Sequence, residues 1–114
     1  MKRGDVVLVR FPFSDYSTTK LRPALIISAD NEKEVCVAFI SSVIPVELDK
    51  TDFLLTEEDD DFVQTRLKKD SVFKMNKIAT LDKSIILGRL GGVSKRLQEE
   101  LDERLRMVFG LCQE

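Results

Sequence analysis

The sequence predicts a mainly β domain of the α+β class: a small, curled SH3-like β-barrel followed by a C-terminal α-helix. Several short runs of valine, isoleucine and leucine are separated by polar turn residues, which is typical of strands. A helical spacing of apolar residues appears only near the end of the chain. The 114 residues contain no repeat and no linker, so we expect a single domain, residues 1–114.

The first two strands are predicted at residues 5–12 and 23–29. The first carries apolar side chains on both of its faces, with Val6 on one face and Val7 on the other. A strand that is apolar on both faces needs cover on both sides. The candidates are the terminal helix and a second copy of the chain, so we expect a homodimer.

Further strands are predicted in the middle of the chain. Residues 35–42 should form a hairpin with the second strand. Residues 43–49 are predicted as a fourth, shorter strand, in which Pro45 indicates an edge or a bulge. Residues 71–81 are predicted as a long strand that bends near Asn76.

The clearest element is a helix near the C-terminus. Ser94 is a favourable N-cap, and Gly110 can end the helix. The apolar residues that recur between them are Leu97, Leu101, Leu105 and Val108. Just upstream, residues 83–87 are expected to form one helical turn, and the glycines within 88–92 to mark a loop.

The composition argues against several classes of protein. The chain has no histidine, which is the commonest acid–base catalyst and metal ligand. Cys36 and Cys112 lack the spacing of metal or redox sites, so we expect reduced, buried thiols and a cytoplasmic protein. No apolar run approaches the ~20 residues that span a bilayer. The first residues also lack a signal-peptide core, so no membrane association is expected.

The net charge of −2 hides a strong segregation of charge. Residues 51–65 hold six acids and no base, most of them in an acidic loop at 56–62. Residues 66–96, the basic block, hold nine bases and only two acids. The basic block suggests a surface for a polyanion or an acidic protein. The alternative, that these lysines and arginines are only a solvated face, stays open on charge alone.

Several stretches of the chain, taken in order, resemble one known family. They are Gly4–Pro12, Leu21–Ser28, Val37–Ser41, Leu67–Val72 and Lys77–Asp82. Together they resemble the MazF/PemK toxins over nearly the whole chain. The resemblance implies a CcdB/PemK-like barrel and the toxin of a type II toxin–antitoxin system. It implies a sequence-specific endoribonuclease, independent of metal and cofactor, that cleaves single-stranded RNA (mRNA) by attack of the ribose 2′-hydroxyl and so inhibits translation.

Arg22 is the best candidate for a catalytic residue. The proline that follows restricts it to an extended conformation, which presents the guanidinium at the mouth of the second strand. A guanidinium is always charged and binds phosphate through a planar fork. A surface ion pair is the alternative interpretation of this arginine.

Ser41 is the second catalytic candidate. By the resemblance it takes the place of a catalytic threonine at the end of the third strand, so the hydroxyl is kept and the methyl group is lost. Ser42 beside it is expected to contact RNA. The alternative interpretation is a serine that only ends the strand.

The loop before Arg22 offers further contacts with RNA. Tyr16 could stack on a base, although a tyrosine that simply covers the barrel mouth fits the sequence equally well. Thr19 and Lys20 could contact phosphates.

The resemblance adds contacts in the last third of the chain. Asn76 and Lys77 fall where the family contacts bases, and Ser71 is expected to help shape the site.

The chain departs from the family pattern at Arg66 and in the loop before Arg22, which is also short of glycine and has Ser17-Thr18-Thr19 instead. The glutamate that is common five residues before the arginine is Ser17 here, so no general base is identified, and the nearest acids are Asp5 and Asp15. Arg66 stands where relatives often have glycine, and the sequence offers no explanation for it.

The partner implied by the resemblance is a cognate antitoxin, largely disordered and acidic, that covers the basic block and occludes Arg22. The alternative function is a catalytically inactive relative that binds RNA or antitoxin. A gyrase poison of the CcdB type shares the fold but depends on a C-terminal Trp-Gly-Ile tail. This chain has no tryptophan, which argues against that function.

Overall fold

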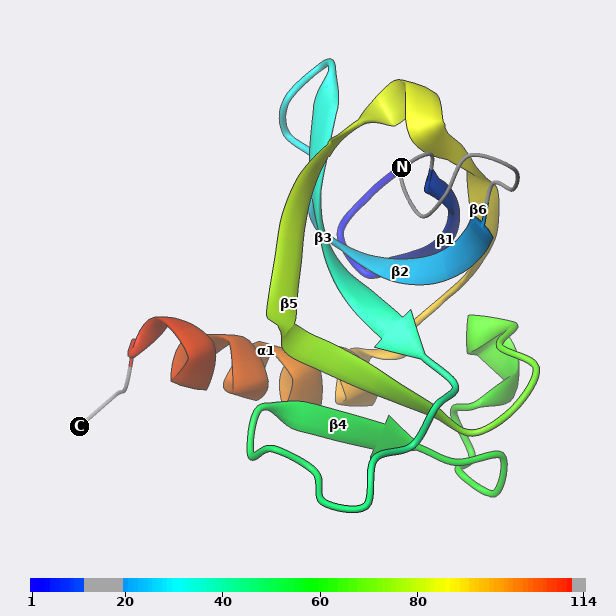
Figure 1. Ribbon diagram of the computed structural model, residues 1–114, viewed down its shortest axis with the longest axis vertical. Helices are drawn as coiled ribbons and strands as arrows, with labels where there is room; N and C mark the ends of the chain where they lie inside the picture. The colour runs from blue at the N-terminus through cyan, green and yellow to red at the C-terminus, as the bar shows by residue number, and fades with distance from the viewer. Residues whose placement is uncertain (12–19, 112–114) are drawn as a thin grey trace.

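The computed structural model describes residues 1–11 and 20–111 (Figure 1). The strands are β1 (Asp5–Phe11), β2 (Lys20–Ser28), β3 (Glu34–Ser41), β4 (Asp52–Leu55), β5 (Ser71–Asp82) and β6 (Ile86–Gly92). The helices are the 3-10 helices η1 (Val63–Thr65) and η2 (Lys83–Ile85) and the α-helix α1 (Lys95–Phe109).

All six strands belong to one antiparallel sheet with the order β4-β5-β3-β2-β1-β6. Figure 1 shows that the sheet curls, so that β1, β2, β6 and the second half of β5 surround a common centre. Because β4 and β6 stand at the two edges, the barrel is incomplete. The predicted mainly β, barrel-like fold with a C-terminal helix is confirmed.

The centre of the sheet is buried on both faces within this one chain. Val7 and Val9 of β1 belong to a core cluster shared with β2 and β3. Val6 belongs to a second cluster that includes Leu97 and Leu101 of α1. β1 therefore does not need a second copy of the chain to cover it, so its apolar faces no longer support the expected homodimer.

Two elements differ from the sequence prediction. Residues 43–49 were predicted as a strand but form none, and the fourth strand is β4, which pairs with β5. Pro45 interrupts the segment and Val46 is fully exposed, so its apolar residues do not point into the core in alternation. The glycines predicted to mark a loop lie in β6, which pairs with β1 across two shifts of register.

β5 bends near Asn76, as the sequence indicated. Its register with β3 shifts between Ala38 and Phe39, so Met75, Asn76 and Lys77 have no partner on that strand. Extra residues of this kind bend a strand, and Figure 1 shows the sharp turn in the middle of β5. The helical turn predicted after β5 is η2.

α1 begins and ends where the sequence indicated. The Ser94 hydroxyl accepts a hydrogen bond from the Leu97 N–H (3.1 Å), which caps the first turn. Gly110 ends the helix with a φ of 68°, a conformation that suits glycine. Leu97 and Leu101 are completely buried, and their packing fixes α1 under the sheet.

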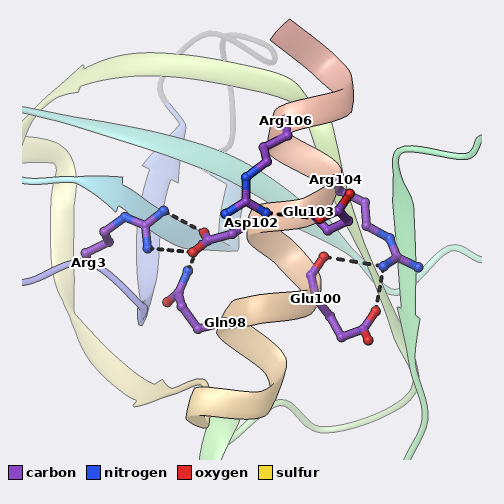
Figure 2. A network of polar contacts seen from close by, with 7 residues as sticks. All are labelled: Arg3, Gln98, Glu100, Asp102, Glu103, Arg104 and Arg106. Carbon is purple, nitrogen blue, oxygen red and sulfur yellow. Dashed lines mark hydrogen bonds and ion pairs between the residues drawn. The ribbon is translucent and has the colours of Figure 1, made fainter. Parts of the chain in front are cut away.

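Charged pairs are spread along α1, as Figure 2 shows. Arg3, near the start of the chain, donates to both carboxylate oxygens of Asp102 (2.6 and 3.3 Å). Within the helix, Arg104 pairs with Glu100 (2.6 Å) and Arg106 with Glu103. Exposed pairs of this kind each contribute about 0–1 kcal/mol, so they support the helix less than its buried leucines do. No helix in the described part of the chain is long and apolar enough to cross a membrane.

Candidate functional site

A cavity of about 440 Å³ opens where β2, the end of β3, the start of β5 and the segment after η1 come together. Its polar lining residues are Arg22, Ser41, Ser42, Arg66, Lys68, Lys69 and Ser71. Its apolar lining residues are Leu8, Leu21, Pro23, Ile40, Leu67 and Leu90. We call it the cationic cavity.

The charged side chains that the structure describes around this cavity are all positive. Arg22, Arg66, Lys68 and Lys69 line it, and no carboxylate is found among its described lining residues. Arg22, Arg66, Lys68 and Lys69 are all exposed, and none of the four forms an ion pair with another described residue. A concave surface with uncompensated positive charge attracts a polyanion.

Arg22 reaches the cavity from within β2. It pairs with Val9 of β1, and the next residue, Pro23, pairs with Leu8. β2 begins at Lys20 rather than after Arg22, so the arginine is held by strand pairing on one side and has an extended backbone as expected. Strand pairing limits the motion of the backbone, so the side chain of Arg22 starts from a well-defined Cα position.

Ser41 is the last residue of β3 and is half-buried. Its hydroxyl oxygen accepts a hydrogen bond from the Val43 N–H (3.1 Å), which fixes the side chain in a tight turn. A hydroxyl that accepts through oxygen keeps its hydrogen for donation. Because no acceptor for that hydrogen is found among the described residues, Ser41 is ready to donate into the cavity.

Ser71 also lines the cavity, but its hydroxyl is already used. It is only 3% exposed, and it donates to the Lys69 carbonyl (2.8 Å). This hydrogen bond holds Ser71 against the turn that carries Lys68 and Lys69, and the role of Ser71 at the site stays a prediction.

Arg66 lines the cavity although the sequence did not identify it as a site residue. It follows η1 and has a left-handed backbone, with a φ of 63°. Glycine adopts this conformation without steric cost, which explains why glycine suits the position. Only the left-handed backbone distinguishes Arg66 from any other arginine in a loop. This backbone conformation cannot be predicted from a pattern in a single sequence.

Three of the residues predicted to bind RNA lie outside the cavity. Lys20 is exposed at the start of β2, and Asn76 and Lys77 are exposed in the bulge of β5. Asn76 stands five residues along β5 from Ser71, which is about 17 Å for extended backbone. Tyr16 and Thr19 lie outside the residues that the structure describes.

Asp5, one of the two acids nearest to the missing glutamate, faces a different environment. It is buried and accepts hydrogen bonds from the Arg89 side chain (2.9 Å) and the Lys2 N–H (2.9 Å). Burial raises its pKa, but these hydrogen bonds and the charge of Arg89 outweigh burial and hold the pKa below its usual range. Asp5 does not line the cationic cavity and has a structural role. Asp15 lies outside the described residues.

The acidic loop also has a structural role. Asp59 and Asp61 both accept hydrogen bonds from the Arg96 guanidinium (2.5 and 2.9 Å), and Asp61 accepts another from the Ser94 hydroxyl. These contacts hold the loop on the start of α1. Among the described residues, no group of three or more aspartate, glutamate or cysteine side chains is arranged to hold a metal ion.

The two cysteines were expected to be reduced and buried. Cys36 of β3 is a free thiol and is half-buried, and burial raises its pKa, so the thiolate is disfavoured. Cys112 lies outside the described residues.

Fold and site together define the class of this protein: an incomplete β-barrel with a C-terminal helix and a cavity lined by arginine and lysine side chains. Solved structures share the fold. An endoribonuclease in complex with its cognate antitoxin, from a mycobacterial species, matches with a TM-score of 0.75 at 18% identity, over 100% of this chain and 99% of that chain. A chain of the MazE–MazF structure from Deinococcus radiodurans matches with a TM-score of 0.73 at 17% identity, over 98% and 97% of the two chains.

Sequence comparison identifies the family. The profile described as "PemK-like, MazF-like toxin of type II toxin-antitoxin system" matches residues 2–109. Endoribonuclease MazF6 of Mycobacterium tuberculosis is 31% identical over 103 residues, which is 88% of each chain. Endoribonuclease MazF of Staphylococcus saprophyticus is 28% identical over 112 residues, 97% of this chain and 92% of the relative. The chain belongs to the PemK-like and MazF-like family of toxins, as the sequence motifs predicted.

Proposed function

We propose that the chain is the toxin of a type II toxin–antitoxin pair and cleaves single-stranded RNA, mRNA in particular, at the cationic cavity. The observation that carries this proposal is the meeting of Arg22 and Ser41 in a cavity that is rich in cations and has no described carboxylate. Such a cavity suits a phosphodiester, and none of its described lining residues is a carboxylate that could bind a divalent metal. Relatives of similar length are named endoribonucleases, which supports the same activity. We place this activity in the cytoplasm, where mRNA is translated.

In the proposed reaction, the ribose 2′-oxygen bonds to the adjacent phosphorus and the bond from phosphorus to the next 5′-oxygen breaks. The 2′-hydroxyl gives up a proton and the leaving oxygen takes one, so the products carry a cyclic phosphate and a 5′-hydroxyl. Negative charge grows on the non-bridging oxygens in the transition state. Arg22 stabilises that charge, and Ser41 donates its available hydroxyl hydrogen to the same phosphoryl group.

The remaining predicted residues are proposed to bind RNA on either side of this centre. Ser42 stands at the rim of the cavity beside Ser41. Lys20, Asn76 and Lys77 are exposed on neighbouring parts of the sheet and would contact nucleotides beyond the cavity. The roles of Tyr16 and Thr19, in stacking and in phosphate contact, stay predictions of the sequence.

Two protein partners are part of the proposal. An acidic segment of a cognate antitoxin would be attracted by the same uncompensated cations and would occlude Arg22.

A second copy of the chain would cover the exposed apolar residues between β3 and β4, among them Val43, Ile44 and Val46. Light scattering should then give twice the mass of the chain, and a monomeric mass at micromolar concentration would contradict the dimer.

The experiment that tests the proposed function is incubation of the purified protein with a long single-stranded RNA in EDTA, followed by mapping of the cut sites. We expect cleavage at a recurring short sequence. Arg22→Ala should abolish cleavage with unchanged thermal unfolding, since Arg22 is exposed and has no described ion-pair partner. Binding of RNA without cleavage by the unaltered protein would favour the alternative function, an inactive RNA-binding module.

A further inference from the structure

Arg66 adopts a backbone conformation that no arginine prefers. With a φ of 63° and a ψ of 17°, it is the one residue other than glycine with a positive φ in the described part of the chain. The left-handed region is unfavourable for residues with a Cβ atom, and asparagine, aspartate and glycine are the types that tolerate it best. The conformation therefore does not explain the choice of arginine at this position.

The conformation is imposed by the surrounding structure. Thr65 is completely buried, and its hydroxyl donates to the Phe62 carbonyl (2.6 Å) and accepts from the Leu67 N–H (3.2 Å). A Cβ atom at Gly91 of β6 would lie 2.4 Å from the Gln64 carbonyl oxygen, so the backbone of η1 lies directly on β6. The turn at Arg66 is thus fixed by contacts that do not involve its side chain.

The side chain of Arg66 lies at the cationic cavity, where the described residues offer it no ion-pair partner. It is exposed, lines the cationic cavity and forms no ion pair with a described residue. Lys68 and Lys69 follow it on the same turn. Arg22 and Ser41 reach the same cavity from β2 and β3. The cavity thus has cations on two separate walls.

We propose that Arg66 is a second phosphate-binding arginine, which holds the phosphodiester next to the one that Arg22 and Ser41 engage. A cavity of about 440 Å³ is of the size that holds a ligand comparable to one nucleotide. The two phosphates that flank such a nucleotide lie at opposite sides of it. With Arg22 on one wall and Arg66 on the other, each phosphate meets a guanidinium, which binds phosphate through its planar fork. This inference rests on the proposed function, since it takes RNA as the ligand.

Because the backbone of Arg66 is left-handed, one substitution can remove its side chain without destabilising the fold. Arg66→Gly removes the guanidinium and replaces it with the residue that the backbone prefers, so the thermal midpoint of unfolding should not fall. Arg66→Lys keeps the positive charge but loses the planar guanidinium that can bind one phosphate through two hydrogen bonds. Lys33→Ala is the matched control, because Lys33 is an exposed cation in the turn before β3, at the end of that strand opposite to Ser41.

The test measures binding and cleavage separately. A labelled single-stranded RNA with 2′-O-methyl riboses cannot be cleaved by 2′-hydroxyl attack, so it reports binding alone. Arg66→Gly should weaken its binding about tenfold and lower the slope of log affinity against log salt by about 0.7, as one fewer neutralised phosphate requires. The RNA affinity of Arg66→Lys should lie between those of Arg66→Gly and the unaltered protein. The affinity of Lys33→Ala should equal that of the unaltered protein. On ordinary RNA, Arg66→Gly should raise KM more than it lowers kcat.

Two results would overturn the inference. The first is binding and cleavage by Arg66→Gly that equal those of the unaltered protein. The second is unchanged RNA binding together with weaker binding of poly-glutamate, which would assign Arg66 to an acidic protein partner. Failure of the proposed function is a separate result, since it would show as no cleavage of ordinary RNA by the unaltered protein, while the binding measurements would still report on Arg66.

Discussion

Ser41 and Ser71 line the same cavity, yet only Ser41 has a hydroxyl hydrogen available for a substrate. Ser71 donates to the Lys69 carbonyl, whereas Ser41 accepts from the Val43 N–H. We predict that Ser41→Ala lowers kcat by roughly 10²-fold, the usual cost of one donor to a developing oxyanion, and by less than Arg22→Ala does. Ser41→Thr should preserve or raise the rate because its methyl group restricts the rotamer.

Single-turnover cleavage of one RNA by each variant measures these rates. Ser42→Ala is the matched control at the rim of the cavity, and its effect on kcat should be small. Full activity of Ser41→Ala would remove Ser41 from the proposed mechanism and leave phosphate binding to the arginines.

Asp5 gives a prediction about stability and pH. Its pKa is held below the ordinary value of about 3.9, so the carboxylate stabilises the fold above that pH and stops doing so as the pH falls through the lowered pKa. Asp5→Asn should therefore cost about 1–3 kcal/mol near neutral pH, because the bonds from Arg89 and the Lys2 N–H are weakened. Denaturant unfolding at several pH values should show this difference shrink below about pH 4. Asp30→Asn, at an exposed aspartate, is the control and should change stability little, and a pH-independent cost at Asp5 would contradict the account.

The site residues differ in how far the sequence could predict them. Arg22 and Ser41 were predicted because each sits in a strand motif that the family shares, and the structure brings both to one cavity. Asn76 and Lys77 were placed by the same motifs, but they lie in the bulge of β5 and do not line the cavity. Arg66 was not predicted, because its position depends on a backbone angle that packing imposes.

At the scale of elements, the contact between η1 and β6 holds one wall of the cavity in place. A Cβ atom on Gly91 would lie 2.4 Å from the Gln64 carbonyl oxygen and 2.6 Å from the Thr65 carbonyl. We predict that Gly91→Ala lowers stability by about 1–3 kcal/mol, the usual cost of overpacking, and reduces cleavage because η1 and the turn at Arg66 must move. Thermal unfolding and cleavage of the same RNA measure the two effects.

Gly88 provides the matched control in the same strand. A Cβ atom there would meet nothing within 4 Å, and its φ is not positive, so Gly88→Ala should be neutral or slightly stabilising and should leave cleavage unchanged. Equal behaviour of the two alanine variants would mean that the η1–β6 contact is not needed for the site.

The sequence predicted the helix whose residues show a clear local pattern. It did not predict the strands that form only because they pair with residues distant in the chain. α1 was predicted from its apolar spacing, the N-cap Ser94 and the terminal Gly110, all of which are local. β6 was missed because its glycines weaken any strand signal, and only pairing with β1 makes it a strand. Residues 43–49 looked more strand-like than β4, yet β4 forms because β5 lies beside it.

At the scale of the whole molecule, the basic block does not act as one surface. Arg89 pairs with Asp5, and Arg96 pairs with Asp59 and Asp61, so these two arginines stabilise the fold. Arg66, Lys68 and Lys69 line the cationic cavity, and Lys77 stands apart in the bulge of β5. The basic block is therefore divided: Arg89 and Arg96 form ion pairs within the fold, whereas Arg66, Lys68 and Lys69 line the cavity, and their binding of a polyanion stays a prediction.

This division predicts different effects for cations that a count of charges would treat alike. Lys68→Ala or Lys69→Ala should weaken binding of all single-stranded RNAs. Each should also lower the slope of log affinity against log salt by up to about 0.7 for each phosphate that is no longer neutralised.

Lys77→Ala should leave the cavity intact and change which sequences are cut. Lys77 is exposed in the bulge, more than about 17 Å along the strand from Ser71, so it should meet a neighbouring base rather than the scissile phosphate. Cut-site mapping on one transcript, with salt titrations of binding, separates the two effects. An unchanged cut pattern in Lys77→Ala, together with changed patterns in Lys68→Ala, would mean that the bases are read inside the cavity and that the RNA does not reach the bulge.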